Sequence, residues 1–332
     1  MTGTTKPARK AQKASPALMR AAAIDKFGPP SVLTIHKVPV PKVGPKEVLI
    51  AVQTAGVGVW DGQIRDGSYK PGKERFPLVL GADGAGTIAE VGKDVRRFKE
   101  GDEVWAYQFT GSKGGFYAEY VAIKADNVGP APKELTLMEA GAAAVTGLTG
   151  LQGIDDKLEV TKADTLLIFG ATGAIGTLAV QFAKRTGAHV IGTASDERGQ
   201  KVLRDIGIEE FFDARADDAP SRLKAFAPQG LTAVLALAGG KALERCIEQV
   251  VDGGRVAYPN GAEPEPRKRA KIKVTSYDVE VGPDEFTRLN RAVTESNLKV
   301  IIDGTYKLDE AAAAHVRLER GHVIGRIALQ IR

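Results

Sequence analysis

The sequence predicts an α/β protein that joins a doubly wound parallel sheet to a second, β-rich unit. Short apolar strands alternate with helices over residues 165–258, which is the pattern of a parallel sheet with crossover helices. Short strand candidates separated by glycine and proline fill residues 20–124, and that pattern is typical of a partly open barrel. The chain has 332 residues, which suits two domains and allows a sizeable core.

The β-rich unit is predicted from short apolar runs that are bounded by turn residues. Prolines at positions 29, 30, 39, 41 and 45 separate the first of these runs. A helical stretch from Leu137 then leads to the parallel-sheet region. The expected strands are residues 21–24, 31–37, 47–55, 86–91, 103–107 and 117–123.

The clearest motif is GATGAIG, which lies between an apolar strand, Thr165 to Phe169, and a helix with apolar residues at helical spacing that Gly187 ends. Such a turn leaves the first helix amides unpaired, and these attract a phosphate. Glycines at this spacing also let a pyrophosphate approach the backbone. The alternative is a turn that serves only packing. The predicted cofactor-binding residues here are Gly170, Ala171, Thr172, Gly173, Ala174, Ile175 and Gly176.

The residues after this turn favour a dinucleotide-binding fold. Strands are expected at 189–193, 211–212, 233–237 and 255–258, and helices at 197–206, 220–227 and 241–251. This alternation indicates a parallel sheet with helices on both faces. Asn260 and Gly261 follow the last of these strands, at the carboxyl edge where such sheets bind ligands, and are therefore predicted to contact the cofactor.

Charge and cysteine content limit the protein's setting. The net charge is +5, but Lys6, Arg9, Lys10 and Lys13 carry most of it, so residues 1–18 are predicted to be a disordered basic tail. The tail weakly resembles an organelle transit peptide, and the alternative is a plain extension. The single cysteine, Cys246, excludes a disulfide within the chain and favours a reducing compartment. We therefore expect a cytoplasmic protein, and no apolar run is long enough to suggest a membrane span.

Four longer motifs together resemble the medium-chain dehydrogenase/reductase superfamily, and within it the zinc-independent quinone oxidoreductase (zeta-crystallin-like) group. They are GADGAGTIAEVGKDVRRFKEGDEVW at 81–105, AAAVTGLTGLQGI at 142–154, GATGAIGTLAVQFAKRTGAHVIGTASDERGQK at 170–201 and EAAAAHVRLERGHVIGRIAL at 310–329. The resemblance implies a chaperonin-10-like (GroES-like) catalytic domain at 19–143, a Rossmann NADP-binding domain at 144–282 and a return segment at 283–332 that completes the first domain. It also implies an active cleft between the two domains and a homodimer.

A zinc site is not expected. A catalytic zinc needs three Cys, His or acidic ligands, and the one cysteine and four histidines form no cluster with ligand spacing. The resemblance places Gly58, Ala82 and Val145 at the positions where zinc-dependent relatives carry Cys, His and Cys. Because none of these side chains binds metal, we predict an enzyme without zinc.

NADPH is the predicted cofactor. The position at which an acidic residue would bind the ribose 2′-hydroxyl and repel a 2′-phosphate is Ala194. Ser195 and Arg198 follow it, and Arg215 comes after the next strand, so these three side chains are the candidates for reading the 2′-phosphate. Asp196 argues for NADH instead, unless it caps the next helix.

Two residues are assigned to the catalytic site by the resemblance. Thr149 matches a family threonine near the nicotinamide, and the alternative is a helix hydroxyl bonded to its own backbone. Asp61 lies in WDGQIRDGSY, which matches a segment that lines the cleft, and the alternative is a structural hydrogen-bond acceptor. Gly58 and Gln63 stand where the family has asparagine and tyrosine.

The predicted reaction is hydride transfer from NADPH to a quinone or another α,β-unsaturated carbonyl compound. Three alternatives are a zinc alcohol dehydrogenase, an alkenal or enoyl-thioester reductase, and a non-catalytic NADPH- or RNA-binding protein. The basic run RKRAKIK at 267–273 is the feature that suggests nucleic acid, but we interpret it as a solvated loop and expect no nucleic-acid partner.

Overall fold

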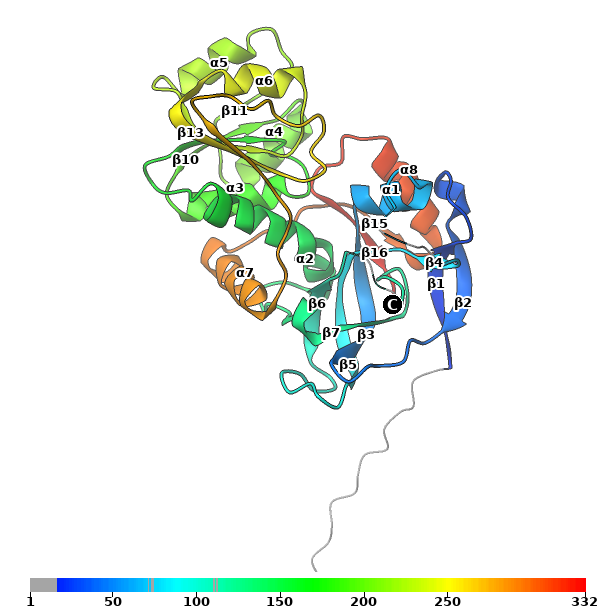
Figure 1. The fold of residues 1–332 in the computed structure, drawn as a ribbon. Coiled ribbons are helices and arrows are strands. Elements are labelled where there is room, and N and C mark those ends of the chain that lie inside the picture. The colour runs from blue at the N-terminus through cyan, green and yellow to red at the C-terminus, as the bar shows by residue number, and fades with distance from the viewer. Residues whose placement is uncertain (1–16, 71, 73–74, 110, 112) are drawn as a thin grey trace, which may run out of the picture.

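The computed structural model describes residues 17–70, 72, 75–109, 111 and 113–332. Of the predicted tail, residues 1–16 lie outside the described residues. The first strand, β1 (Leu18–Ile24), begins at the last residue assigned to that tail. Figure 1 shows two units side by side, with the last part of the chain (orange to red) returning to the unit in which the described chain begins. Among the described residues, no helix is long and apolar enough to cross a membrane.

The predicted doubly wound sheet is confirmed. Its six parallel strands run in the order β11-β10-β9-β12-β13-β14, which is the order of a dinucleotide-binding sheet. Alternate residues of β9 enter two different cores: Leu166 and Ile168 pack with α3 and α4, whereas Leu167 and Phe169 pack with α5 and α6. The strands are β9 (Thr165–Phe169), β10 (His189–Thr193), β11 (Phe211–Phe212), β12 (Leu231–Ala236), β13 (Val250–Pro259) and β14 (Lys273–Tyr277), and the helices are α3 (Gly176–Arg185), α4 (Glu197–Asp205), α5 (Ala219–Phe226) and α6 (Lys241–Ile247).

The β-rich unit is a barrel-like pair of sheets. A seven-stranded sheet has the order β15-β16-β3-β5-β6-β8, with β7 paired to β3, and a smaller sheet has the order β2-β1-β4. The C-terminal strand β16 pairs with β3, so the end of the chain completes this sheet. The remaining strands are β2 (Thr34–Pro39), β3 (Glu47–Val57), β4 (Leu78–Val79), β5 (Asp83–Val91), β6 (Glu103–Tyr107), β7 (Tyr120–Lys124), β8 (Val128–Pro130), β15 (Ile302–Lys307) and β16 (Arg326–Gln330).

Helix α2 (Leu137–Gln152) joins the two units. Thr136 caps it by accepting a hydrogen bond from the Glu139 amide, and the Glu139 carboxylate accepts one from the Thr136 amide, so the helix start is fixed by a capping box. Small residues let the helix lie close to the barrel: a Cβ at Gly141 would lie 2.7 Å from the Thr54 carbonyl oxygen. The other helices of the barrel side are α1 (Val59–Asp66), α7 (Pro283–Ser296) and α8 (Ala311–Glu319).

Several predicted elements were wrong in extent. The strand expected at 117–123 begins only at Tyr120, and those expected at 86–91 and 255–258 begin earlier, at Asp83 and Val250. The helix expected at 241–251 ends at Ile247, because β13 begins at Val250. This strand contains Gly253 and Gly254, and Gly253 adopts a φ of 81°. The strand expected at 31–37 starts only at Thr34, because Pro30 opens a single 3₁₀ turn. Helix α1 was not predicted, although Gly58 precedes it and Gly67, at φ 81°, ends it.

Candidate active site

The glycine turn has the geometry that a dinucleotide needs. Gly170 adopts a φ of 89° and its amide donates to the Thr193 hydroxyl at 2.8 Å, which holds the turn on β10. A Cβ at Gly176 would lie 2.2 Å from the Gly170 carbonyl oxygen, so only glycine lets α3 start this close to β9. Residues 172–175 remain partly exposed at the start of α3. The turn therefore presents backbone to solvent at a helix N-terminus, where a phosphate binds well.

The C-terminal segment touches this turn. Gly325, at φ 74°, donates its amide to the Thr172 carbonyl oxygen at 2.8 Å and forms a β-bridge with Gly173. A Cβ at Gly325 would lie 2.1 Å from the Ile301 carbonyl oxygen. The barrel strand β16 thus begins directly beside the predicted pyrophosphate site.

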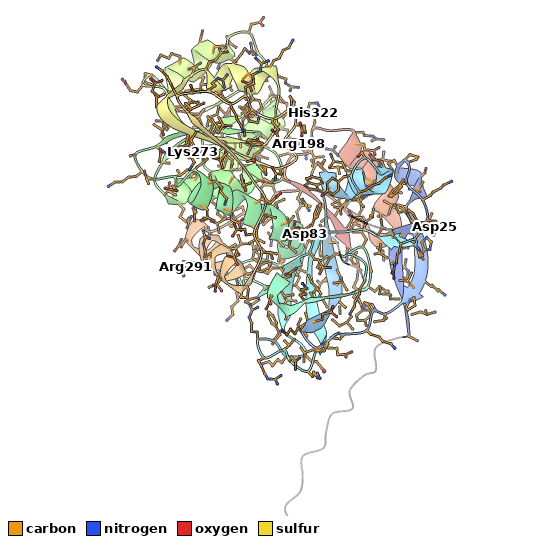
Figure 2. The ribbon with its side chains drawn as sticks, in the orientation of Figure 1. Asp25, Asp83, Arg198, Lys273, Arg291 and His322 are labelled. Atoms are coloured by element: carbon orange, nitrogen blue, oxygen red, sulfur yellow. The ribbon has the colours of Figure 1, made fainter. Side chains whose placement is uncertain are left out.

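The residues predicted to read a 2′-phosphate lie at the ends of neighbouring strands. Ser195 is exposed just after β10, and Asp196 caps α4 by accepting from the Gly199 amide at 2.7 Å. The capping alternative for Asp196 is therefore what the structure shows. Arg198 of α4 pairs with Asp303 of β15, so this ion pair joins the two units, and Figure 2 labels Arg198. Arg215, after β11, pairs only loosely with Asp213, at 3.6 Å.

Aromatic rings of the barrel cover the carboxyl edge of β13. Gly261 has a φ of 93°, and a Cβ there would lie 2.7 Å from the Trp60 ring. Trp60 packs edge-on against Tyr69 and Phe109, with ring centroids 4.8 and 5.4 Å away. Gly261 and its neighbour Asn260 therefore lie opposite α1. Sequence reasoning missed Trp60 and Phe109, because nothing local marks a contact with a residue 200 positions away.

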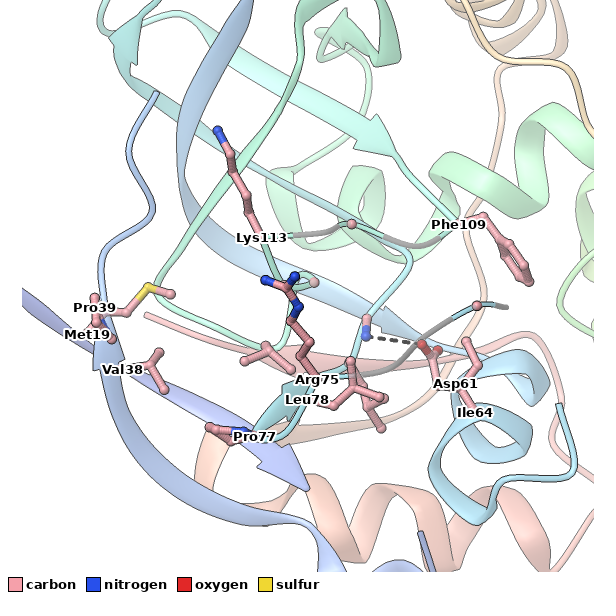
Figure 3. A pocket seen from close by; sticks show the side chains of 17 residues that line it. Met19, Val38, Pro39, Asp61, Ile64, Arg75, Pro77, Leu78, Phe109 and Lys113 are labelled. Atoms are coloured by element: carbon pink, nitrogen blue, oxygen red, sulfur yellow. Dashed lines mark hydrogen bonds between the residues drawn. The ribbon is translucent and has the colours of Figure 1, made fainter. Parts of the chain in front are cut away.

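A cavity of about 730 Å³ opens beside α1. Figure 3 shows it from close by, with Phe109, Ile64 and Asp61 at one side and the Arg75 side chain nearer the middle. This volume is within the range of small-molecule sites. Its wall is mostly apolar, and charged groups are few, so it suits an uncharged organic molecule with a small number of polar atoms.

Asp61 takes the structural role that the sequence left open, and it also lines the cavity. Its carboxylate accepts from the Gly58 amide at 2.8 Å and from the Gly81 amide at 3.2 Å, the second of which Figure 3 draws as a dashed line. Burial is the main reason that the pKa of Asp61 rises to about 6, against the opposing backbone hydrogen bond from Gly58. A carboxyl at the cavity therefore changes charge close to neutral pH.

Thr149 makes the hydrogen bond that the alternative interpretation of this residue predicted, from its hydroxyl to the backbone of its own helix. Its hydroxyl donates to the Val145 carbonyl oxygen at 2.8 Å, within α2, and its own carbonyl accepts from the Tyr277 hydroxyl at 3.0 Å. The next residue, Gly150, lies against the start of α3, since a Cβ there would be 3.5 Å from the Ile175 carbonyl oxygen. Thr149 is thus beside the glycine turn, with hydroxyl lone pairs still able to accept.

A buried ion pair lies near Gly58, Ala82 and Val145, the three positions that were predicted to carry no zinc ligand. Asp83 and Arg326 are both buried, and the Asp83 Oδ1 to Arg326 Nη2 distance is 2.7 Å. The other Asp83 oxygen accepts from the Val145 amide at 3.1 Å. Burial raises the pKa of Asp83, and the guanidinium opposes that rise. No cluster of three His, Cys, Asp or Glu suited to a metal occurs in the described part of the chain, so these residues do not fit a zinc ion.

Asp61 is the last member of a buried chain of hydrogen bonds that also includes Arg65, His315 and Tyr117. Arg65 Nη1 donates to His315 Nδ1 at 3.2 Å, so the ring proton of a neutral His315 sits on Nε2 and donates to the Tyr117 oxygen, also at 3.2 Å. Tyr117 then hydrogen-bonds Asp61. Burial, with a smaller effect of Arg65, lowers the pKa of His315 from 6.5 to about 3. His315 therefore stays neutral in the folded protein.

His315→Gln is expected to make the free energy of unfolding depend less on pH below neutrality. The unfolded chain protonates this histidine below pH 6.5, whereas the folded chain does so only near pH 3, so stability falls as the pH drops through that window. At about 1.4 kcal/mol per pH unit, the wild type should lose about 2 kcal/mol more than the variant between pH 7 and pH 5. Urea unfolding at both pH values measures this, and equal losses would contradict it. Glutamine keeps an acceptor for Arg65 and a donor for Tyr117.

Comparisons with known proteins agree with this geometry. An alcohol dehydrogenase GroES-like domain matches residues 44–133, and a zinc-binding dehydrogenase domain matches residues 174–276. The quinone oxidoreductase of Lama guanicoe is 31% identical over 332 residues, covering 95% of this chain and 98% of that protein. A solved NAD-dependent alcohol dehydrogenase superposes with a TM-score of 0.87 at 31% identity, covering 95% of this chain and all of that one.

A third comparison concerns the cofactor. A mycobacterial protein whose structure was solved with NADPH superposes with a TM-score of 0.83 at 26% identity, covering 94% of this chain and 100% of that chain. The family model's name mentions zinc, but the residues that the resemblance matches to the ligands of zinc-dependent relatives are Gly58, Ala82 and Val145, whose side chains bind no metal. The glycine turn, the barrel that β16 completes and the near full-length match to a quinone oxidoreductase together confirm the resemblance in the sequence. The chain belongs to the quinone oxidoreductase group of the medium-chain dehydrogenase/reductase superfamily.

Proposed function

We propose that this protein is a zinc-independent oxidoreductase that uses NADPH to reduce a quinone or another α,β-unsaturated carbonyl compound. The observation that supports it best is the juxtaposition of the glycine turn with β16, at the side of a barrel whose zinc positions carry no ligand. Bound NADPH supplies the hydride. The chain's part is to hold the cofactor and the acceptor together, to exclude water and to stabilise developing charge.

The cofactor would be held by residues of the parallel-sheet unit. Residues 170–176 would take the pyrophosphate on their backbone, and Ser195, Arg198 and Arg215 would take the 2′-phosphate. Asn260, Gly261 and Thr149 would border the nicotinamide. Asp61 would face the acceptor from the cavity, and no residue of this set is proposed to bind a metal.

A conjugated acceptor suits this site better than a simple alcohol or ketone. Without a Lewis acid, negative charge on a lone carbonyl oxygen is stabilised by hydrogen bonds alone. An extended π-system already spreads that charge over several atoms. We also propose a homodimer and a cytoplasmic location, which light scattering and cell fractionation would test. An alkenal or enoyl-thioester reductase is the second candidate, because its acceptor is also a conjugated carbonyl compound.

NADPH oxidation measured with 1,4-quinones, enals and enones, beside oxidation of simple alcohols with NADP⁺, tests this function. We expect turnover with conjugated acceptors and none with alcohols. Alcohol oxidation without quinone or enone reduction would overturn the proposal. Tight NADPH binding with no turnover at all would indicate a binding protein. The basic run offers that alternative little support, because Arg269 and Lys271 pair with Glu244 and Asp252.

Exhaustive chelation is expected to leave activity and melting temperature unchanged. Gly58, Ala82 and Val145 offer no zinc ligand, so there is no metal whose removal could unfold the site. Elemental analysis of the purified protein, before and after chelator treatment, is the measurement. One zinc per chain, lost together with activity, would refute this expectation.

A further inference from the structure

Three aromatic rings from separate segments of the barrel unit meet at the carboxyl edge of β13. Trp60 is on α1, Tyr69 follows that helix, and Phe109 follows β6. We call these three residues the aromatic cluster. Each pair of rings meets edge-on, and the Tyr69 and Phe109 centroids are 5.6 Å apart. Because Phe109 is far from the other two in the chain, only the fold brings the three rings together.

The aromatic cluster lies between the cavity beside α1 and the carboxyl edge of the parallel sheet. Phe109 lines that cavity and also a second one of about 510 Å³, and Figure 3 shows its ring on the side where Asp61 and Ile64 lie. Trp60 is four residues before Ile64, so both side chains are on the same face of α1. The Trp60 ring also touches the sheet edge, where a Cβ at Gly261 would be 2.7 Å from it. A molecule that reaches from the cavity to this edge therefore lies against the rings.

The aromatic cluster and its neighbour Val59 keep apolar surface that the fold does not cover. Tyr69 is 36% exposed and Val59 is 62% exposed, and Trp60 and Phe109 are only partly buried. Large apolar groups that stay exposed beside a cavity are typical of a binding site, because a ligand that covers them releases water. Three of these four side chains are rings, so a flat aromatic ligand covers this surface best.

We propose that Trp60 and Phe109 determine substrate specificity: they form an aromatic wall for the acceptor and select a quinone with fused, planar rings over a linear enal or enoyl thioester. Tyr69 is a positioning residue that holds the Trp60 ring, at a centroid distance of 4.8 Å. This inference rests on the proposed function, and it names which of the two candidate substrate classes the site favours. Aromatic pairs are more favourable than their contact area alone predicts, and a linear chain cannot form them.

The competing explanation is purely structural, with Trp60 fastening α1 to the loop at Gly261. A structural loss would affect every acceptor equally, whereas loss of an aromatic contact affects fused-ring quinones alone. Trp60→Leu and Phe109→Leu separate the two explanations, because leucine keeps an apolar side chain but removes the ring. Trp60→Phe restores a ring. Phe226→Leu, which changes a partly buried ring on α5 of the other unit, is the matched control.

Steady-state rates with 1,4-naphthoquinone and trans-2-hexenal are the first measurement. We expect Trp60→Leu and Phe109→Leu each to lower kcat/KM for naphthoquinone about tenfold, mainly through KM, and kcat/KM for hexenal by less than about twofold. Trp60→Phe should regain most of the loss, and Phe226→Leu should match the wild type with both acceptors. Equal losses for the two acceptors, or no loss for either, would overturn the inference.

Equilibrium dialysis gives a readout that needs no turnover. The probe is 2,3-dimethyl-1,4-naphthoquinone, because its methyl groups block the addition of protein thiols and amines to the quinone ring. We expect its dissociation constant, with NADP⁺ and without it, to rise about tenfold in both leucine variants of the wall and to stay unchanged in Phe226→Leu. A wild type that does not bind the probe, or leucine variants that bind it equally well, would refute the aromatic wall. Inertness of the wild type towards all quinones and enones would instead refute the proposed function, and dialysis would still decide the role of Trp60 and Phe109.

Discussion

Replacing Asp83 with alanine is expected to lower the free energy of unfolding by about 3–5 kcal/mol. Asp83 is fully buried, and its partner Arg326 is 7% exposed. The variant would leave that guanidinium inside the barrel without a counter-charge and the Val145 amide without its acceptor. Both groups lose water on folding and regain nothing in the variant, so the penalty falls entirely on the folded state.

Denaturant unfolding of Asp83→Ala beside a double variant, Asp83→Leu with Arg326→Met, tests the source of this loss. Apolar side chains of similar volume often replace a buried ion pair without a stability cost. We therefore expect the double variant to regain most of the stability lost in Asp83→Ala, and the Val145 amide, which still lacks its acceptor, accounts for the remainder. A loss below about 1 kcal/mol in Asp83→Ala would mean that Arg326 is hydrated when unpaired.

The parallel-sheet half of the fold could be predicted because its signals are local. Each strand is a short apolar run, and a glycine or a capped helix follows within a few residues, as with Gly170 after β9 and Asp196 before α4. The prediction of a helix over 241–251 was wrong at its end, because its last residues suit a strand equally well. Pairing with β12 makes those residues part of a strand. Propensity alone does not contain that information.

The candidate site could be predicted only where its residues are close in sequence. The glycine turn is one continuous motif, and its geometry follows from its own residues. Asp83 and Arg326 are 243 residues apart, and Trp60 meets Gly261 across the cleft. No local pattern marks such pairs, so the sequence predicted that Gly58, Ala82 and Val145 bind no zinc without indicating the ion pair near them. Arg198 was likewise predicted as a phosphate ligand with no sign of its partner Asp303.

Arg198→Ala is expected to weaken NADPH binding by about ten- to a hundredfold and NADH binding by less than about threefold. The two cofactors differ only in the 2′-phosphate, so a residue that reads this group affects one and spares the other. Arg198 lies at the start of α4, close to Ser195. Asp303 occupies one face of its guanidinium, and the fork geometry of arginine leaves further donors for a phosphate.

Dissociation constants for both cofactors, measured by calorimetry for Arg198→Ala, Ser195→Ala and Arg215→Ala, identify the residue that reads the phosphate. Asp303→Asn is the matched control: it removes the charge that competes with the phosphate, while Arg317, which binds the other Asp303 oxygen at 2.6 Å, stays in place. NADPH should bind this control at least as tightly as the wild type. Equal weakening of both cofactors by Arg198→Ala would indicate a structural role through Asp303. Unchanged binding of both cofactors would indicate that Ser195 or Arg215 binds the 2′-phosphate, or that NADH is the cofactor.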